Sequence, residues 1–217
     1  MASAQRKKLH DLAEILAQGL AELGLRVPAA TQRKLLDYVA LIAKWNRVHN
    51  LTAVRESTTM VSNHLLDCLA VVPHLDARPV LDVGSGAGLP GIPLALVWPQ
   101  AHVTLLDSNH KKAAFLRQAT IELGLSNTEV VCERVETWQP QREFELVISR
   151  AVSDLPEFLN LAGRLCAADG TVAAMKGLYP HEELAQLPSG FNLRGVVPLK
   201  VPGMRAERHL VLLNPVR

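Results

Sequence analysis

Cysteine is scarce in this chain of 217 residues. Its three cysteines, Cys68, Cys132 and Cys166, are far apart in the sequence and form no CxxC pair. An odd number of cysteines with this spacing is typical of neither a disulfide framework nor a zinc site. We therefore expect buried, reduced thiols and no bound metal ion.

Long apolar runs are also absent from the sequence. None approaches the roughly 18 apolar residues that a membrane-spanning helix needs. The basic residues 6–8 are not followed by the apolar segment of a signal peptide. Aromatic residues make up only 4% of the chain, so aliphatic side chains must fill most of the core. We expect a soluble, cytoplasmic protein that has no membrane partner.

Neither sign of charge is in clear excess. Lysine and arginine number 23 against 21 aspartates and glutamates, which gives a formal net charge of +2. A balance this close does not by itself indicate a nucleic-acid partner, which only a local cluster of basic residues would suggest. The length and the 48% hydrophobic share are typical of one globular domain with a modest extension. We take a monomer as the expected oligomeric state.

The first 78 residues have the periodicity of amphipathic helices. Apolar residues recur at helical spacing in three stripes, within 9–23, 35–45 and 61–72. Each apolar stripe must be covered, so these helices should pack on one another and on the segment that follows. We predict an N-terminal helical cap over residues 1–78.

From about residue 79 the pattern alternates between strands and helices. The predicted strands lie at 80–83, 102–106, 130–132, 144–148 and 171–175. The helix candidates between them lie at about 91–97, 110–123 and 154–167. This alternation predicts a mostly parallel sheet with helices on both faces, so residues 79–217 should form an α/β domain. Two more extended runs, at about 191–201 and 207–214, are typical of an antiparallel pair.

A glycine-rich turn follows the first predicted strand. Gly84, Gly86 and Gly88 alternate just after Asp82, and the segment then opens into a helix. Glycine is needed where the backbone has a positive φ or where a ligand lies against the main chain. A second acid, Asp107, ends the next strand, where its carboxylate can accept both hydroxyls of a ribose. This combination indicates a nucleotide site.

The same glycines allow two other interpretations. Residues 86–91 also match the GxGxxG pattern of a nicotinamide or flavin site, and a glycine turn can be purely structural. The nicotinamide hypothesis predicts NAD binding, but the chain has no identifiable hydride-transfer site.

The turn and the second acid together resemble motif I and the following acidic position of class I S-adenosylmethionine-dependent methyltransferases. The final antiparallel pair is similar to the closing strands of that fold. The resemblance implies a Rossmann-like, mostly parallel seven-stranded sheet with a terminal antiparallel pair. It also implies S-adenosyl-L-methionine as the cofactor.

A series of short motifs over about residues 40–215 narrows this resemblance. The motifs are Trp45-Asn46, Asn50-Leu51-Thr52, His64-Leu65-Leu66-Asp67, Gly84 to Pro93, Leu106-Asp107-Ser108, Arg134-Val135-Glu136, Ile148-Ser149-Arg150-Ala151, Met175-Lys176-Gly177 and Glu207-Arg208-His209-Leu210. Their order closely resembles the RsmG (GidB) family of bacterial rRNA guanine-N7 methyltransferases. The resemblance implies methylation of guanine 527, in the 530 loop of 16S rRNA, with free rRNA, the 30S subunit or an assembly intermediate as partner.

The resemblance implies cofactor contacts from several loops. They fall on Gly84, Leu89, Val135, Glu136 and Arg150, to which the glycine pattern and the second acid add Gly86, Gly88 and Asp107. Glu136 or a neighbouring amide would meet the amine of the adenine ring. Arg150, just after the fourth strand, would touch cofactor or substrate.

Basic and polar residues near strand or helix ends are candidates for contacts with the substrate. Lys176 ends the fifth strand, Arg208 precedes the last one, and Asn50 lies near a helix end among other basic residues. If such residues surround the mouth of the cofactor site, they would bind rRNA phosphates with a salt-dependent affinity. The alternative is that they are ordinary solvated residues.

The end of the fourth strand bears on the chemistry. Ser149, Arg150 and Ala151 stand where enzymes that methylate an exocyclic amine usually carry an Asn/Asp-Pro-Pro-aromatic run. Enzymes that methylate a pyrimidine carbon need a nucleophilic cysteine, and no such motif is present. Guanine N7 needs neither device because its lone pair is available at neutral pH. We therefore assign no general base and expect in-line methyl transfer that depends on alignment.

One further expectation and two alternatives complete the hypothesis. His64 and Asp67, three residues apart, should form a polar brace over the cofactor pocket rather than a metal pair. The alternative enzyme is a class I methyltransferase that acts on a small molecule or a protein. The alternative of another kind is a non-catalytic ribosome-assembly factor that keeps a nucleotide pocket.

Overall fold

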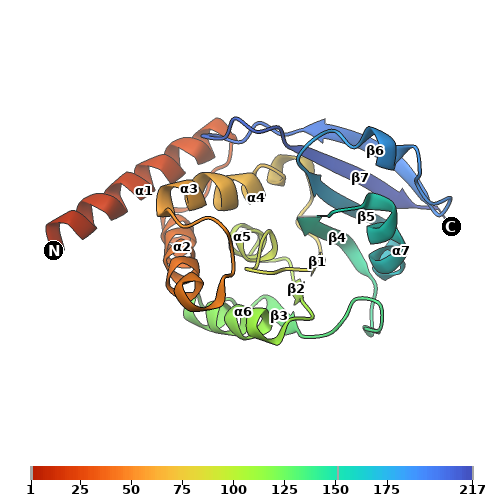
Figure 1. The fold of residues 1–217 in the computed structure, drawn as a ribbon, viewed down its shortest axis with the longest axis horizontal. Helices are drawn as coiled ribbons and strands as arrows, with labels where there is room; N and C mark the ends of the chain where they lie inside the picture. The colour runs from red at the N-terminus through yellow and green to blue at the C-terminus, as the bar shows by residue number, and fades with distance from the viewer. Residues whose placement is uncertain (1, 151, 217) are drawn as a thin grey trace.

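The computed structural model describes the backbone of residues 2–150 and 152–216. Helices form the first part of the chain, as its apolar stripes predict (Figure 1). They are α1 (Ala2–Glu22), α2 (Ala29–His49), α3 (Ser57–Met60), the π-helical turn η1 (Val61–Leu66), α4 (Asp67–Leu69) and the 3-10 turn η2 (Val72–His74). The amino end of α1 projects beyond the rest of the molecule, while Leu12, Leu16 and Leu20 bury its second half. None of the described helices is both long and apolar enough to cross a membrane.

The second part of the chain forms one seven-stranded sheet. Its strands are β1 (Val80–Val83), β2 (Val103–Leu106), β3 (Thr128–Val131), β4 (Phe144–Arg150), β5 (Cys166–Lys176), β6 (Phe191–Pro198) and β7 (His209–Pro215). They lie in the order β3-β2-β1-β4-β5-β7-β6. The first five strands pair in parallel, and β7 runs antiparallel to both β5 and β6. The predicted sheet and its terminal antiparallel pair are confirmed.

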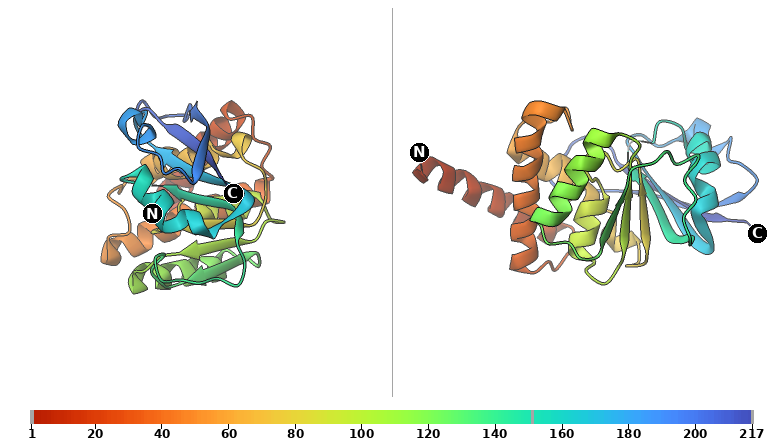
Figure 2. Two further views of the ribbon diagram at one scale, coloured as in Figure 1. Left: turned by 90° about the vertical axis from the view of Figure 1, so that its right-hand side faces the viewer. Right: turned by 90° about the horizontal axis from the view of Figure 1, so that it is seen from below.

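Helices cover both faces of the sheet (Figure 2). The larger core lies on the face covered by α2, α5 (Gly91–Val97) and α6 (His110–Glu122). The smaller core lies under α7 (Leu155–Ala162), with the 3-10 turn η3 (Gly163–Leu165) and α8 (His181–Leu184) nearby. Neighbouring residues of β4 divide between the two cores: Ile148 belongs to the larger and Val147 to the smaller. This is the alternation expected of a strand that is buried on both faces.

The N-terminal helices share the larger core with the sheet. That core runs from Leu16 in α1, through Leu65 in η1, to Ile92 in α5 and Phe115 in α6. The extension therefore packs against the α/β part through a continuous apolar interior, and polar side chains from it can reach the carboxyl edge of the sheet.

Several element boundaries differ from the prediction. The helix predicted over 154–167 is α7 and ends at Ala162, where η3 and then β5 follow. The third strand begins at Thr128 rather than at 130, and its half-buried residues do not form an apolar run because β3 is an edge strand. The fifth strand begins at Cys166, because an irregular segment that includes Asp169 and Gly170 joins its first residue to the predicted run. Polar residues and glycine within this strand hid its beginning.

The prediction for the cysteines is wrong at one position. Cys68 and Cys166 are buried, but Cys132 is only partly buried. It follows the end of β3, and its Sγ lies 3.3 Å from Nδ1 of His110 at the start of α6. A position just beyond an edge strand leaves the Cys132 thiol within reach of solvent.

Candidate functional site

Two cavities open where the parallel strands end. The first, which we call the glycine-loop cavity, has a volume of about 300 Å³. It is lined by Val83, Gly84, Leu106, Asp107, Ser108, Lys112, Glu133, Arg134, Val135 and Glu136. The second, which we call the arginine cavity, has a volume of about 290 Å³ and is lined by Asp67, Arg150, Val152, Met175, Lys176, Gly177 and Arg208. Because the carboxyl ends of parallel strands meet at one edge of a sheet, both cavities lie in the region where open α/β folds bind ligands.

The glycines of the loop after β1 serve different purposes. Gly84, Gly86 and Gly88 have φ angles of +68°, +59° and +86°, which favour glycine. A Cβ added to Gly84 would meet no atom within 4 Å, whereas one added to Gly88 would lie 2.5 Å from Cδ1 of Ile92. Gly84 therefore keeps the floor of the cavity open, and Gly88 allows close packing of the loop on α5.

Asp107 ties the glycine loop to the end of β2. Its Oδ2 accepts from the backbone N–H of Gly86 at 2.9 Å, and its Oδ1 accepts from the N–H of Asn109 at 2.8 Å. The side chain of Asn109 in turn caps α6 by accepting from the N–H of Lys111. Each carboxylate oxygen of Asp107 keeps a second lone pair for a ligand in the cavity.

A buried acid holds the loop from below. Asp82 has no exposed surface, and its Oδ2 accepts from the N–H of Gly91, at the start of α5, at 2.9 Å. Its other carboxylate oxygen is buried and has no hydrogen-bond partner among the described residues. Burial raises the pKa of Asp82 to about 7, while the hydrogen bond from Gly91 limits the rise. On the opposite side, the hydroxyl of the buried Tyr38 in α2 donates to the carbonyl of Ala87.

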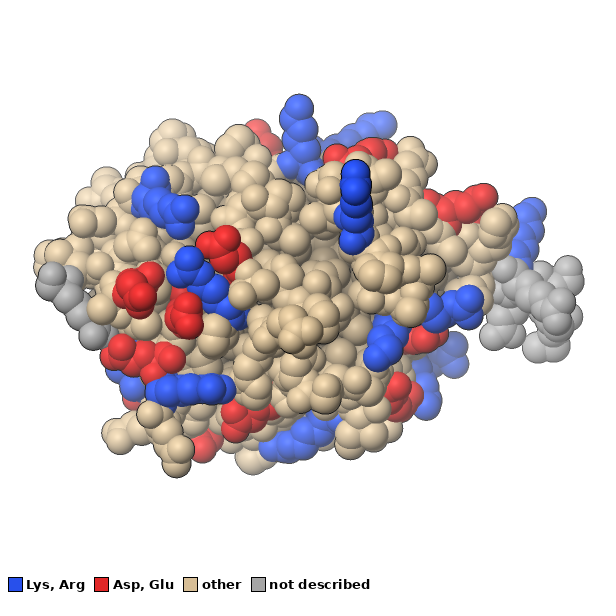
Figure 3. Space-filling view, turned by 180° about the vertical axis from the view of Figure 1, so that it is seen from behind, with Lys and Arg blue, Asp and Glu red and all other residues tan. Residues whose placement is uncertain are grey.

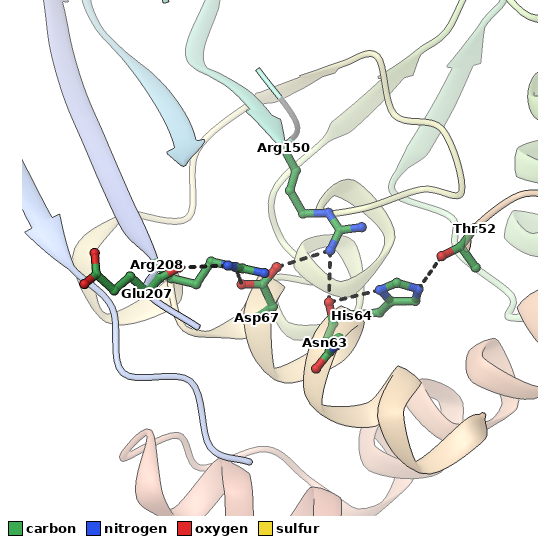
Figure 4. Close-up of polar contacts among 7 residues, drawn as sticks. All are labelled: Thr52, Asn63, His64, Asp67, Arg150, Glu207 and Arg208. Carbon is green, nitrogen blue, oxygen red and sulfur yellow. Dashed lines mark hydrogen bonds and ion pairs between the residues drawn. The ribbon is translucent and has the colours of Figure 1, made fainter. Parts of the chain in front are cut away.

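The arginine cavity has a buried ion-pair cluster at its base (Figure 4). The side chain of Asp67 is only 3% exposed. Its Oδ2 lies 3.2 Å from Nη1 of Arg150, at the end of β4, and its Oδ1 lies 3.1 Å from Nε of Arg208, just before β7. One carboxylate from the helical extension thus joins two strands that are far apart in the sequence. Asp67 lines the arginine cavity, and the predicted brace of His64 and Asp67 over the cofactor pocket stays a prediction.

The π-helical turn η1 gives this cluster a second acceptor. The N–H of Asp67 donates to the carbonyls of Ser62 and His64, and not to that of Asn63, which would be its partner in a regular α-helix. The carbonyl of Asn63 instead accepts from Nη1 of Arg150 at 3.0 Å. The wider turn therefore helps to orient Arg150 (Figure 4).

His64 belongs to the same support and is uncharged. Its Nδ1 lies 3.0 Å from the carbonyl oxygen of Asn63, which can only accept, so Nδ1 carries the proton. Nε2 then accepts from the hydroxyl of Thr52 at 2.9 Å. Burial lowers the pKa of His64, and the nearby charge of Arg150 lowers it further. This chain of hydrogen bonds fixes the loop after α2 against η1.

Lys176 closes the far side of the arginine cavity. Its Nζ donates to Glu183 at 2.8 Å, to the carbonyl of Val152 at 2.9 Å and to that of Ser153 at 3.4 Å. Glu183 also accepts from the N–H of Leu155 at 2.7 Å. The three ammonium hydrogens are thus engaged, and Lys176 holds α8 and the start of α7 beside the cavity.

The structure separates the predicted site residues into four groups. Gly84, Asp107, Val135 and Glu136 line the glycine-loop cavity, and Arg150, Lys176 and Arg208 line the arginine cavity. Gly86 donates to Asp107, while Gly88 and Leu89 pack inside the loop. Asn50 ends α2 with a φ of +46°, accepts from Arg55 at 2.9 Å and lines neither cavity.

The sequence prediction missed several residues of each lining. They are Val83, Leu106, Ser108 and Glu133 in the glycine-loop cavity, and Val152, Met175 and Gly177 in the arginine cavity. All of them lie within six residues of a strand end, so a rule that takes the last residues of each parallel strand and the whole segment after it would have found them.

Known proteins resemble this chain in sequence and in fold. The family model described as GidB, rRNA small subunit methyltransferase G, matches residues 31–211. A protein of Laribacter hongkongensis named ribosomal RNA small subunit methyltransferase G is 58% identical over 204 residues, which cover 94% of this chain and 99% of that protein.

Two solved structures share the fold at low identity. A SAM-dependent methyltransferase from Aquifex aeolicus is 21% identical with a TM-score of 0.54, and the match covers 70% of this chain and 91% of that one. The glycopeptide N-methyltransferase MtfA in complex with S-adenosyl-L-methionine is 12% identical with a TM-score of 0.61, covering 71% and 88%. The architecture is that of class I methyltransferases.

Proposed function

The chain belongs to the rRNA small subunit methyltransferase G family, and from this membership we propose that it methylates N7 of guanine 527 in the 530 loop of bacterial 16S rRNA. The observation that carries the proposal is the match over residues 31–211, which includes the linings of both cavities. The cofactor is S-adenosyl-L-methionine, which supplies a methyl group on a positively charged sulfur.

The residues of the glycine-loop cavity fit a nucleoside of this kind. The open side of Gly84 admits a ligand against the main chain, where a side chain would fill the space. Asp107 spends one lone pair of each oxygen on backbone N–H groups and keeps the others for two ribose hydroxyls. Val135 and Glu136, on the far wall, offer an apolar surface and an acceptor for an adenine ring.

We propose that the enzyme works by aligning the methyl donor with guanine N7 and that it uses no general base. Guanine N7 already has an available lone pair, so no proton has to be removed before the attack. Of the three buried acids among the described residues, Asp67 pairs with two arginines, Asp107 accepts from backbone N–H groups, and Asp82 lies beneath the loop with no exposed surface, where it accepts from the N–H of Gly91. Alignment of the reacting atoms lowers a barrier by roughly 7–11 kcal/mol at best, which is a sufficient source of rate enhancement for this transfer.

The candidate substrate contacts take different parts in this proposal. Arg208 lines the arginine cavity as part of its ion-pair cluster and contacts RNA directly. Lys176 acts by holding the wall of that cavity. Asn50 and Arg55, an exposed pair at the end of α2, contact a more distant part of the RNA.

Charge on the surface is in keeping with a local RNA contact. On the face shown in Figure 3, acidic and basic side chains surround a broad uncharged middle, and the described residues form no continuous basic patch on that face. A formal net charge of +2 also gives little long-range attraction. The electrostatic contribution must therefore come from a few residues at the site.

The geometry of RNA limits how the target is reached. In an A-form helix N7 lies in a deep, narrow major groove that side chains cannot enter. The target guanine is therefore presented in a loop, flipped out of its stack, or met before the subunit has finished folding.

The test is methyl transfer from labelled S-adenosyl-L-methionine to 16S rRNA and to 30S subunits from a strain that lacks this protein. We expect one methyl group per 16S rRNA, mapped by mass spectrometry to N7 of a guanine in the 530 loop. Subunits from the parent strain are the control and should accept none. Cofactor binding without transfer to either RNA substrate would instead support an assembly factor, and transfer only to small molecules or proteins would support the other enzyme.

A further inference from the structure

One aromatic side chain of this chain lies in solvent. Phenylalanine, tryptophan and tyrosine together make up only 4% of the residues. Among the residues whose side chains the structure describes, Tyr179 is the only one of these three types that is exposed, at 40% of its surface. Its neighbour Leu178 is 75% exposed. Two consecutive large apolar side chains thus meet solvent, and contiguous exposed apolar surface is a feature of interaction sites.

This pair of residues lies next to the arginine cavity. Tyr179 is two residues beyond Gly177, which lines that cavity, in the segment between β5 and α8. The carbonyl oxygen of Gly177 lies 2.9 Å from Nδ1 of His209, and Arg208, the residue before His209, also lines the cavity. Tyr179 packs edge-on against His209 with ring centroids 5.6 Å apart. The exposed ring is therefore beside the mouth of the cavity and not part of its lining.

The neighbours of Tyr179 hold its ring in place. The ring of His181, the first residue of α8, lies against it with centroids 4.3 Å apart and planes tilted by 39°. The N–H of His181 also donates to the carbonyl of Tyr179 at 3.0 Å. Because Pro180 follows it, the backbone of Tyr179 is biased toward extended conformations. A ring that is already fixed loses little conformational entropy when a ligand stacks on it.

The ring of Tyr179 also keeps its polar group available. Its hydroxyl has no hydrogen-bond partner within residues 2–150 and 152–216. The other tyrosine, Tyr38, has no exposed surface and donates to the carbonyl of Ala87. An exposed π surface with a polar edge matches a nucleobase, which has the same two features.

The proposed substrate supplies a reason for such a contact. A guanine that is flipped toward the cofactor leaves the next base of the strand without its stacking partner. Aromatic side chains provide that stacking in proteins that bind unpaired RNA. The contribution does not depend on charge, and a chain with a net charge of +2 has little long-range attraction for RNA.

We propose that Tyr179 is a stacking platform for an unpaired base of the substrate RNA, the one next to the target guanine in the strand. His181 and His209 support the ring, and Leu178 extends the apolar surface. Because Tyr179 lies outside the cavity lining, it meets a neighbour of the target and not the base that is methylated. This inference rests on the proposed function and adds to it how the enzyme recognises the RNA around its target.

The experiment compares Tyr179→Phe, Tyr179→Leu and Tyr179→Ala with the wild-type enzyme. Three quantities are measured: the KM for unmethylated 30S subunits, the dependence of kcat/KM on salt concentration, and the Kd for S-adenosyl-L-methionine by calorimetry without RNA. Leu193→Ala is the matched control, because Leu193 is 42% exposed but lies in β6 opposite Leu213. Leu213 in turn pairs with Val172, well before the carboxyl end of β5. Circular dichroism checks that each variant is folded.

For Tyr179→Ala we expect a KM about tenfold higher, a nearly unchanged kcat, and a Kd for the cofactor within twofold of wild type. Tyr179→Phe keeps the ring, so its KM should stay within about threefold of wild type. Tyr179→Leu keeps an apolar side chain without the π surface, so its KM should be close to that of Tyr179→Ala. The slope of log(kcat/KM) against log[salt] should be the same in every variant, because stacking releases no counterions.

Three outcomes would overturn the proposal. One is a KM that Tyr179→Ala leaves at the level of Leu193→Ala. Another is a Tyr179→Leu variant that keeps the wild-type KM while Tyr179→Ala loses it, which would indicate an apolar contact with a ribosomal protein. The third is a Tyr179→Phe variant as impaired as Tyr179→Ala, which would assign the effect to the hydroxyl. If the wild-type enzyme transfers no methyl group to rRNA, the proposed function itself fails, and this result is distinct from all three.

Discussion

The two cavities at the carboxyl edge of the sheet are built in different ways. The glycine-loop cavity is bounded by backbone and by short segments that directly follow β1, β2 and β3. The arginine cavity is bounded by long charged side chains from residues 67, 150, 176 and 208, which come from the helical extension and from three strand ends. Backbone turns fix the shape of the first, and ion pairs fix the shape of the second.

We propose that the first construction suits the cofactor and that the second suits an anionic ligand. A cofactor is the same in every turnover, so a cavity with glycine φ angles above zero and no side chain at the contact suits it. Oriented guanidinium groups suit a carboxylate or a phosphate better. Substitutions in the first cavity should act on cofactor affinity at any salt concentration, and those in the second should act on the affinity for an anionic group in a salt-dependent way.

The largest effect should come from Gly84→Val. The new side chain would occupy the open side of the loop, and we expect cofactor Kd to rise by about a thousandfold, or about 4 kcal/mol. Gly24→Val is the matched control, because Gly24 also has a φ of about +70° and open space but lies at the end of α1. Both variants should lose a similar free energy of unfolding, roughly 1–2 kcal/mol from the strained backbone. Calorimetry with the cofactor checks the prediction, and equal cofactor affinity in the two variants would contradict it.

The next largest effect should come from the ionisation of Asp82, the buried acid beneath the glycine loop, and should appear as a pH dependence of stability. The pKa of Asp82 in the folded protein, about 7, lies above its ordinary value of 3.8. Between those values the native state binds the proton more tightly than the unfolded chain, so this residue's contribution to stability is lost as the pH rises from about 4 to about 7. The loss is of the order of 4 kcal/mol at most.

Asp82→Asn cannot ionise and should remove this pH dependence. As the pH rises across the same window, the wild-type protein should lose stability and the variant should not. The difference in free energy of unfolding, variant minus wild type, should therefore increase. Urea unfolding at several pH values checks this, and two parallel stability curves would show that Asp82 does not carry the effect.

A smaller effect should follow from Asp107→Ala. The variant loses the acceptor for the cofactor ribose and the hydrogen bond from Gly86, so we expect the Kd for the cofactor to rise about 10–100-fold. Asp107→Asn keeps one carbonyl acceptor, so its Kd for the cofactor should lie between those of Asp107→Ala and the wild-type enzyme. The KM for RNA at saturating cofactor should not change for either variant. If the KM for RNA changed as much as the Kd for the cofactor, the prediction that Asp107 acts only on the cofactor would be wrong.

The smallest effect should come from Thr52→Val, on the support of the arginine cavity. The valine has the same shape but can neither donate to Nε2 of His64 nor accept from the N–H of Val54, so we expect a loss of about 1–2 kcal/mol in the free energy of unfolding. Thr58→Val in the exposed part of α3 is the control. Chemical denaturation gives both values, and cofactor Kd should stay at the wild-type level in each. A weaker cofactor affinity in Thr52→Val, but not in Thr58→Val, would contradict the prediction. It would show that the hydrogen bond between Thr52 and His64 also supports the cofactor site.

The arrangement of the glycine-loop cavity followed from the sequence, because its parts are local. Each of its segments follows a predicted strand, and parallel strands bring the segments after their carboxyl ends to one edge. Gly84 and Asp107 could be placed there without knowledge of distant contacts. Which glycine faces a ligand and which faces Ile92 could not be predicted, because both have a positive φ and differ only in what packs against them.

The arginine cavity did not follow from the sequence. Asp67 pairs with Arg208 across 141 positions, and no local pattern signals such a partner. The π-helical turn that places the carbonyl of Asn63 beside Arg150 has the apolar spacing of an ordinary helix. Lys176 was predicted as a substrate contact, but whether its ammonium hydrogens are available depends on Glu183, seven residues further along the chain.

The sequence by itself determined where the strands lie along the chain, the helical extension and the glycine-loop cavity. Periodicity, glycine spacing and acids at strand ends were enough, because each of these features depends on neighbours in the chain. Only the tertiary structure decided which charged side chains meet, how many of their donor groups remain, and which side of each glycine is open. The physical reason is that hydrophobic patterns act over a few residues, whereas a buried ion pair exists only where the fold has brought two distant segments within about 3 Å.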